Sequence, residues 1–320
     1  MSNLKKEILS LLDRERFISG QNIANMLGVS RTSVWKSIKV LKEEGYSIES
    51  VTNKGYHLKN PPAYVNPTAL SMLISQSSLF DRVEYFKTTP STQKEAFSML
   101  PESNDTFVVV AEEQTEGRGR FDRRWDSPGR TGVYISLVLR PDIPISDIIR
   151  FNLFISLAIA ESIDEAFGVE TGIKWPNDIY IHGKKVCGFL TEVVSESGVI
   201  NAIVCGIGIN IFKDDTVGKI PTAISVEEAA GTHVHMDLDL FMKTFMGNIE
   251  IYYNSFLSEP FSRIRETWIK KSVIFGRQLR ITESHGTFYG RALDITDDGF
   301  LEVLDNNGNI KKVISADVEL

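Results

Sequence analysis

The sequence has little of what metal-binding, redox and secreted proteins need. Its 320 residues include two cysteines and five histidines, and neither type shows a zinc-site spacing or a CxxC pair. Cys187 and Cys205 each stand in an apolar, strand-like segment, which is typical of buried thiols. We therefore expect no metal site formed by the protein itself.

Long apolar segments are also missing. The most apolar stretch, residues 151–160, includes Asn152 and Ser156 and is too short to span a bilayer. Residues 1–6 lack the apolar region of a secretory signal. These absences predict a cytoplasmic protein with no membrane partner.

The chain does have an uneven distribution of charge. Its net charge is −7, from 35 Lys and Arg against 42 Asp and Glu. Residues 1–59 nevertheless carry ten basic and six acidic side chains, a charge of +4, whereas the remainder carries −11. A basic head on an acidic body predicts a separate N-terminal module with an anionic partner.

Residues 4–58 have the pattern of three helices followed by a hairpin. Ser19 and Ser30 precede the second and third helical segments, and Gly28 separates them. This is the layout of a winged helix-turn-helix. In that fold the second helix of the helix-turn-helix pair, here the third helical segment, faces a DNA groove. A module that binds another protein is the alternative. The predicted DNA contacts are Arg31, Thr32, Ser33, Lys36 and Lys54.

The rest of the chain predicts two further units, so the expected fold class is α+β. After a linker at 61–66, alternating strand and helix patterns run to about residue 270 and indicate a mixed sheet with helices. The tail has short strands separated by Asp-Gly and Asn-Gly turns, which indicates a small β domain. The expected domains are residues 1–62, 63–270 and 271–320.

The central unit contains a loop suited to an anionic, aromatic ligand. Residues 117–125 hold four arginines, two glycines and Trp125. Arginine forks match phosphate and carboxylate oxygens, and glycine lets the backbone approach a ligand closely. A nucleotide fits this description, and a solvated basic turn is the alternative.

Three other polar clusters stand where a sheet alone would not need them. Ser91-Thr92-Gln93 opens a predicted helix, where hydroxyls either cap the helix or serve a ligand. Residues 174–178 end a strand in a Pro-Asn-Asp turn. Residues 206–210 fail as a dinucleotide fingerprint, because Ile211 stands where a third glycine is expected. Their glycines instead favour close ligand approach to a strand.

In combination these clusters resemble a biotin–protein ligase, in the bifunctional form that is also the biotin operon repressor. The winged helix and the β tail extend the resemblance to nearly the whole chain. One departure is Asp122, where the family's loop usually has another glycine. The resemblance rests on Ser91-Thr92, Glu113-Gln114-Thr115, Gly117-Arg118-Gly119-Arg120, Arg123, Trp125, Lys174-Trp175-Pro176-Asn177-Asp178, Lys185-Val186-Cys187-Gly188 and Gly206-Ile207-Gly208-Ile209-Asn210.

The resemblance implies a two-step reaction and several partners. The biotin carboxylate attacks the α-phosphate of ATP, which enters with Mg²⁺, and a lysine of a biotin carrier protein then attacks the biotinyl-5′-adenylate. The adenylate-bound chain is implied to form a homodimer that binds operator DNA. The tail is implied to be an SH3-like barrel. A lipoate–protein ligase, a ligase without an operator role and a biotin sensor without ligase activity remain alternatives.

The resemblance also implies roles for individual residues. The catalytic cations would be Lys185, Arg118 and Arg120. Biotin would contact Ser91, Thr92, Gln93, Gln114, Gly117, Arg118, Gly119, Arg120, Lys185 and Gly188. ATP would contact Arg120, Arg123, Trp125, Lys174, Asn177, Lys185 and Asn210. Because four arginines repel one another, we expect the loop to be mobile until the adenylate orders it.

Overall fold

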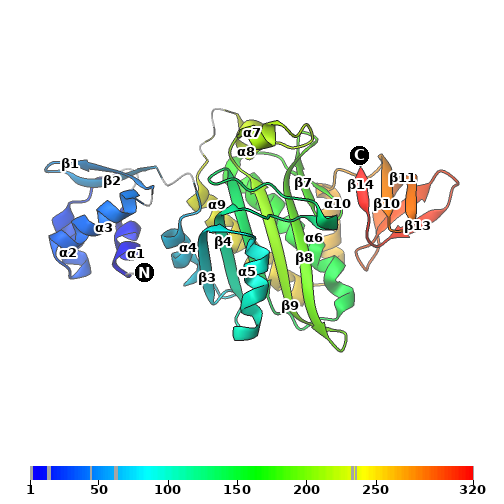
Figure 1. Ribbon diagram of the computed structural model, residues 1–320, viewed down its shortest axis with the longest axis horizontal. Helices are drawn as coiled ribbons and strands as arrows, with labels where there is room; N and C mark the ends of the chain where they lie inside the picture. The colour runs from blue at the N-terminus through cyan, green and yellow to red at the C-terminus, as the bar shows by residue number, and fades with distance from the viewer. Residues whose placement is uncertain are drawn as a thin grey trace.

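The structure is a computed structural model that describes residues 3–319 except 13–15, 44, 61–63, 232–233 and 235. Three units follow one another along the long axis of the molecule (Figure 1). The expected boundary at residue 62 and the first half of the expected linker lie outside the described residues. That boundary and the one at residue 270 stay predictions.

The N-terminal unit has the predicted helices and hairpin around a core of its own. Ser19 caps the second helix by accepting a hydrogen bond from the Asn22 N–H, and Gly28 ends that helix with a φ of 64°. Ile23, Val34 and other apolar side chains fill the space between the helices. The elements are α1 (Asn3–Leu11), α2 (Gly20–Leu27), α3 (Arg31–Glu43), β1 (Ser47–Val51) and β2 (Gly55–Asn60).

The central unit is built on a seven-stranded sheet with the order β3-β4-β5-β9-β8-β7-β6. β3 and β4 are parallel, and the other paired neighbours in this sheet are antiparallel. The predicted mixed sheet is therefore confirmed. Its strands are β3 (Arg82–Thr89), β4 (Phe107–Gln114), β5 (Gly132–Leu139), β6 (Gly172–Lys174), β7 (Asp178–Ile181), β8 (Lys184–Glu196) and β9 (Val199–Asn210).

Helices cover both faces of this sheet unequally. α5 lies on one face, whereas α6 and α9 pack against the other (Figure 1). Successive side chains of β4 point to opposite faces of the sheet. Val108 and Val110 enter the large core, and Val109 packs toward α5. The helices are α4 (Pro67–Ile74), α5 (Thr92–Met99), α6 (Ile148–Phe167), α7 (Asp215–Gly218), α8 (Val226–Ala230), α9 (Leu238–Ser258) and α10 (Phe261–Lys271), with short 3₁₀ turns η1 (Leu100–Glu102), η2 (Arg120–Asp122) and η3 (Ile145–Asp147).

The C-terminal unit is a five-stranded antiparallel sheet with the order β13-β12-β11-β10-β14. Its apolar side chains belong to the same continuous core as the central unit. The buried Trp175 indole donates to the Gly299 carbonyl at 3.2 Å, which joins the two units. The strands are β10 (Gln278–Glu283), β11 (Gly286–Ile295), β12 (Leu301–Asp305), β13 (Ile310–Val313) and β14 (Asp317–Glu319).

The predicted α+β class is confirmed by this arrangement. Among the described residues, none of the helices combines the length and apolar character required to cross a membrane.

Candidate active site

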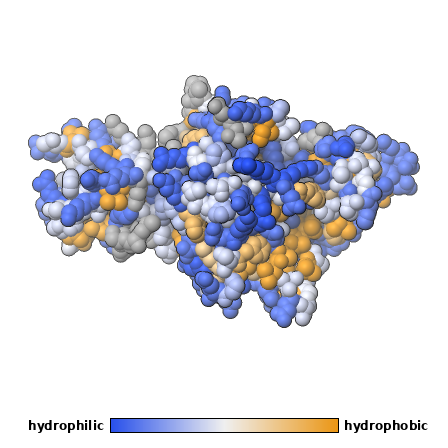
Figure 2. Space-filling view, in the orientation of Figure 1, coloured by the Kyte–Doolittle hydropathy of each residue, from blue (hydrophilic) through white to orange (hydrophobic). Residues whose placement is uncertain are grey.

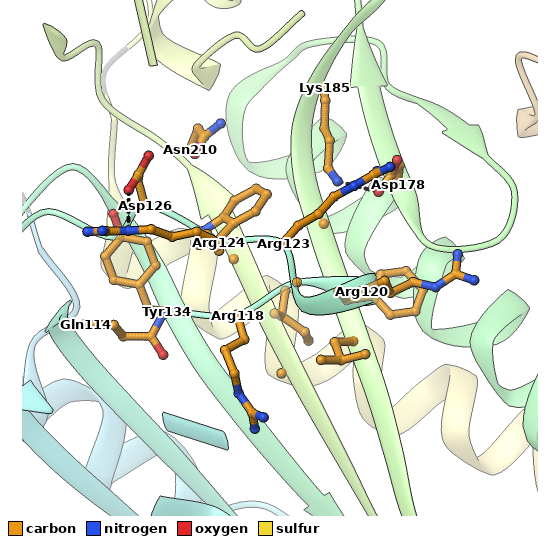
Figure 3. A pocket seen from close by; sticks show the side chains of 18 of the residues that line it. Gln114, Arg118, Arg120, Arg123, Arg124, Asp126, Tyr134, Asp178, Lys185 and Asn210 are labelled. Atoms are coloured by element: carbon orange, nitrogen blue, oxygen red, sulfur yellow. Dashed lines mark ion pairs between the residues drawn. The ribbon is translucent and has the colours of Figure 1, made fainter. Parts of the chain in front are cut away.

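A cavity of about 240 Å³ opens between the start of α5, the arginine-rich loop and the exposed face of β8 and β9 (Figure 3). It brings together side chains from segments that lie far apart in the sequence. Of the predicted ligand-binding residues, its lining includes Ser91, Thr92, Gln93, Gln114, Arg118, Gly119, Arg120, Arg123, Trp125, Asn177, Lys185, Gly188 and Asn210.

The Ser-Thr-Gln cluster forms the buried end of the cavity. Ser91 is the N-cap residue of α5, but among the described residues its side chain makes no capping hydrogen bond. The Gln114 side-chain oxygen accepts from the Thr92 N–H at 2.9 Å, and its amide nitrogen donates to Ser127 at 2.9 Å. The Ser136 hydroxyl donates to Thr92 at 2.8 Å. This network fixes hydrogen-bonding groups that can orient a bound ligand.

The arginine-rich loop folds back on itself as a small hairpin. The Gly119 N–H donates to the Arg123 carbonyl at 2.7 Å, and the Trp125 N–H donates to the Gly117 carbonyl at 2.9 Å. At its tip Phe121 and Asp122 have φ values of 55° and 57°, the signs of a type I′ turn. The extra glycine that the family's loop usually carries is therefore replaced by an aspartate in a left-handed conformation.

The arginines of this hairpin point to different partners. Arg118 lies 3.8 Å from Glu192 on β8. Arg120 donates to Asn177 at 3.0 Å and to Ser315 at 3.2 Å, and Arg123 pairs with Asp317. The loop is thus fastened to the C-terminal unit. Burial lowers the pKa of Arg120, and the carboxylates of Asp178 and Asp317 oppose that shift only in part.

A carboxylate between two lysines forms a charge cluster beside the cavity. Asp178 lies 2.6 Å from the Lys185 Nζ and 3.2 Å from the Lys174 Nζ. Figure 3 shows Lys185 and Asp178 meeting on one side of the cavity. Burial acts to lower the pKa of Lys174, but Asp178 and Tyr180 outweigh it and raise that pKa. Lys174 is therefore a cation.

Three glycines make room on the floor of the cavity. A Cβ on Gly208 would lie 2.3 Å from the Trp125 Nε1, and one on Gly188 would lie 2.8 Å from the Lys185 Nζ. A Cβ on Gly206 would lie 2.6 Å from the Gln93 Oε1. The close approach expected at these strands is therefore made by side chains of the protein itself, and Trp125 lies across the floor.

Two predicted site residues lie outside the lining of the cavity. Lys174 is buried behind Asp178. Gly117 sits within the base of the hairpin, where a Cβ would lie 2.3 Å from the Trp125 carbonyl oxygen. A ligand role for either residue stays a prediction.

The cavity also includes residues to which the sequence analysis assigned no ligand contact. Asp178 belongs to a motif already singled out, and Tyr134 points inward from β5 by strand alternation, so both had a sequence signal. Asp317 and the segment 217–223 had none. The additional lining residues are Phe121, Arg124, Asp126, Pro128, Thr131, Tyr134, Asp178, Phe189, Leu190, Gly206, Ile207, Gly208, Val217, Ile220, Thr222, Ala223 and Asp317.

The predicted DNA contacts lie apart from this cavity, on α3 and at the turn between β1 and β2. Arg31, Thr32 and Lys36 are exposed on α3. Ser33 is half-buried, and its N–H donates to the Ser30 side chain at 3.1 Å, which caps the helix. Lys54 is exposed at the turn, with its Nζ 5.9 Å from the centre of the Phe17 ring.

Chemically, the cavity suits an elongated ligand with a small polar end group and an anionic middle. Fixed hydrogen-bonding groups lie at the α5 end, and the hairpin arginines and Lys185 supply positive charge above the floor. Preorganised cations of this kind stabilise charge that develops on phosphate and carbonyl oxygens. The Trp125 ring and the side-chain amide of Asn210, the last residue of β9, border the remaining space.

Comparison with known proteins relates each unit to a described family. Residues 85–210 match the model of the biotin/lipoate A/B protein ligase family. Residues 5–57 match an HTH domain, and residues 274–320 match the biotin protein ligase C-terminal domain.

Several relatives match almost the entire chain, and two of them show the range of identity. The bifunctional ligase/repressor BirA of Bacillus subtilis (strain 168) is 38% identical over 327 residues, which cover 100% of this chain and 99% of the relative. The protein of the same description from Escherichia coli (strain K12) is 25% identical over 316 residues, covering 98% and 96%. A solved biotin protein ligase from Aquifex aeolicus in complex with biotin and ATP has a TM-score of 0.63 at 26% identity, covering 75% of this chain and 98% of that one.

Proposed function

Because the chain belongs to the family of bifunctional biotin–protein ligases and biotin repressors, we propose that it makes biotinyl-5′-AMP from biotin and ATP and transfers biotin to a carrier protein. The observation that carries this proposal is the cavity, in which a fixed polar end and a cluster of cations flank one continuous space. The acceptor is a lysine of a carrier domain of a biotin-dependent carboxylase, acetyl-CoA carboxylase or pyruvate carboxylase.

Biotin occupies the end of the cavity nearest α5. Ser91, whose hydroxyl is not used to cap the helix in the described structure, and the fixed Gln114 amide face the ureido ring. The carboxylate of biotin then points toward the hairpin, where Arg118 and Arg120 hold it beside the α-phosphate. Gly188 leaves the space for this approach.

Lys185 is the main catalytic cation. It neutralises the repulsion between the biotin carboxylate and the α-phosphate, and it stabilises AMP as the leaving group in the transfer step. Asp178 holds the Lys185 ammonium in place at 2.6 Å, and Lys174 shares that carboxylate from behind. Asp178 is thus a positioning residue, although it was absent from the predicted set.

ATP occupies the side of the cavity bordered by Trp125, Asn177 and Asn210. Arg123 reaches the phosphates once it leaves Asp317, and Trp125 covers the adenine after moving off the glycine floor. Mg²⁺ enters with ATP. The cavity carboxylates Asp126, Asp178 and Asp317 are already paired with cations, so the metal is held mainly by phosphate oxygens and water.

The winged helix makes the adenylate-bound chain an operator-binding repressor. Arg31, Thr32, Ser33, Lys36 and Lys54 supply the contacts, and a homodimer supplies two-fold symmetry for two half-sites. Figure 2 shows hydrophobic residues gathered on the lower part of the central unit, and Val194 and Val199 are exposed at the end of the β8–β9 pair. This apolar surface supports dimerisation through the central sheet. The protein acts in the cytoplasm.

The decisive experiment for the ligase uses purified chain, ATP, Mg²⁺ and a carrier domain, with biotin or lipoate as the acid. We expect the carrier to gain the mass of one biotinyl group and to remain unmodified with lipoate. Modification by lipoate alone would identify a lipoate ligase. For the repressor, titration of its biotin-gene promoter should show tighter binding when biotin and ATP are both present. A promoter affinity independent of biotin would leave a ligase without an operator role.

A further inference from the structure

Trp35 on α3 is an exposed aromatic residue that the predicted DNA contacts leave out. Its relative exposure is 54%, whereas Trp175 and Trp268 are fully buried. The inner face of α3 is formed by Val34, Ile38 and Leu41, so Trp35 has no part in the module's core. An exposed tryptophan on the helix proposed to bind DNA is available to contact that partner, and aromatic side chains are enriched at binding interfaces.

Cations surround Trp35 on the same helix. Arg31 and Lys39 lie one turn before and one turn after it, and Lys36 follows it directly; all three are exposed. Lys39 is in part balanced by Glu43 at 3.9 Å. The surface is therefore basic with an indole at its centre, and residues 1–59 carry a net charge of +4. An anionic polymer that also offers apolar groups is complementary to it.

The position of Trp35 along α3 points to the bases of DNA. The helix begins at Arg31, and the first part of a recognition helix is the part that enters the major groove. A helical side chain leans toward the helix N-terminus, so the indole covers the turn that contains Arg31 and Thr32. An indole neutralises no phosphate. Its contribution in the groove is apolar contact with a base edge, for which the thymine C5-methyl is the available group.

Resting on the operator role proposed above, we propose that Trp35 is a specificity-determining residue that reads an A·T base pair of the operator through the thymine methyl group. Arg31, Lys36 and Lys39 position the helix on the phosphates, and Trp35 selects the sequence.

The test measures operator binding by the full-length chain with biotin, ATP and Mg²⁺ present. The probe is a duplex of the promoter region that the chain protects from cleavage, together with duplexes in which single thymines are replaced by deoxyuridine. Each replacement removes one C5-methyl group. Wild type and Trp35→Ala are compared over a range of salt concentrations, with Met26→Ala as the control for loss of an exposed apolar side chain and Lys36→Ala as the control for a phosphate contact.

We expect one deoxyuridine replacement per half-site to weaken wild type at least about five-fold and to leave Trp35→Ala unaffected. Trp35→Ala itself should weaken the native duplex by a similar factor without changing the salt dependence. Lys36→Ala should instead reduce that dependence, because it removes a phosphate contact. Met26→Ala should bind as wild type does, and adenylate synthesis should be unchanged in all variants.

The proposal is overturned if no deoxyuridine replacement weakens wild type, a result that does not depend on how any variant folds. It is also overturned if a replacement weakens wild type and Trp35→Ala equally, or if Trp35→Ala keeps native affinity, as it would if the indole bound a partner protein. A wild-type chain that shows no biotin-dependent promoter binding refutes the operator role itself, and this result is recognised before any variant is examined.

Discussion

At the residue scale, Lys185 is held in place from two sides. Its ammonium contacts Asp178 and lies 5.4 Å from the centre of the Trp125 ring, and its backbone N–H donates to the Thr222 carbonyl at 2.8 Å. A lysine anchored in this way presents a fixed charge to the cavity and needs little rearrangement when negative charge develops there.

Lys185→Ala should reduce adenylate formation roughly 10²- to 10³-fold, the usual effect of losing one preorganised donor. Biotin binding should be reduced much less, because the Ser91 and Gln114 end of the cavity is untouched. The measurement is biotin-dependent exchange of pyrophosphate into ATP, alongside biotin affinity by calorimetry. Lys184→Ala is the matched control, and near-normal exchange in Lys185→Ala would remove this lysine from the mechanism.

Site residues that belong to short sequence motifs could be predicted. Those that folding brings to the cavity from distant parts of the chain could not. The arginines of the loop and Lys185 stood in motifs, and the structure places them around one cavity. Asp317 belongs to a different unit and reaches the cavity because β14 pairs with β10 beside the hairpin. Strand pairing at that sequence separation has no local signal, so such a residue was beyond prediction.

At the scale of elements, the tip of the arginine hairpin is a turn with unfavourable residues. A bulky side chain in the left-handed region destabilises the turn by about 1–2 kcal/mol. The Arg120 guanidinium carbon lies 4.8 Å from the centre of the Phe121 ring, and a contact of this kind stabilises the turn by only about 0.5–1 kcal/mol. Relief of backbone strain should therefore dominate if both tip residues are replaced by the Asn-Gly pair that type I′ turns prefer.

The variant Phe121→Asn with Asp122→Gly should close the hairpin more tightly. We expect trypsin to cleave after the loop arginines several-fold more slowly than in wild type, while cleavage elsewhere in the chain proceeds at the same rate. The rates are followed by mass spectrometry of the ligand-free protein. Equal or faster cleavage within the loop would show that the turn does not limit its opening.

A second element-scale contact makes stability depend on pH. Glu250 on α9 accepts hydrogen bonds from the Ser77 hydroxyl at 2.7 Å and from the Ser78 and Leu79 N–H groups at 2.6 Å and 2.9 Å. Burial acts to raise the pKa of Glu250, but these hydrogen bonds outweigh it and lower that pKa. The carboxylate therefore joins α9 to the turn before β3 most strongly while it is ionised.

Because the folded-state pKa of Glu250 is depressed, its contribution to stability should be complete above the unfolded value of about 4.3 and should be lost as the pH falls below it. Glu250→Gln should lower the melting temperature at pH 7, and the difference from wild type should shrink by pH 3. Exposed Glu266→Gln is the control. A constant difference across this range would assign the effect to packing and not to ionisation.

Most elements were predictable because each follows from a short repeating pattern. The strands of the central sheet alternate or are wholly apolar, and α6 and α9 carry long apolar faces. α4, α10 and the short helices α7 and α8 were not predicted. α4 has apolar side chains around most of its circumference and so lacks a clear periodic face. α10 has mostly polar residues and is fixed by tertiary contacts, such as the buried Trp268 indole that donates to Ser156 at 2.9 Å.

At the scale of the whole molecule, the winged helix and the cavity occupy separate units with separate cores. Deletion of residues 1–63 should therefore abolish operator binding, because every proposed DNA contact is removed. Adenylate synthesis should remain, because all residues that line the cavity lie beyond residue 90. The two activities are measured by promoter titration and by pyrophosphate exchange.

The informative control for that deletion is the full chain with Arg31→Ala and Lys36→Ala, which keeps the module but loses its charge. It should bind promoter poorly and retain the exchange activity of wild type. If the deletion abolished exchange while this double variant kept it, the N-terminal unit would have a structural role in the ligase that its separate core does not suggest.

The pairing of β5 with β9 also has a consequence for how the chain folds. Gly132 pairs with Asn210, and Leu139 pairs with Ile203, so the middle of the sheet joins segments separated by the whole of α6, β6, β7 and β8. Contacts of this kind form late, since a long loop must close before they are made. The floor of the cavity belongs to the same β8–β9 and β5–β9 ladders. During refolding, the ability to bind a nucleotide and the burial of the central core should therefore arise in one kinetic phase, which makes ligand binding a reporter of completed folding.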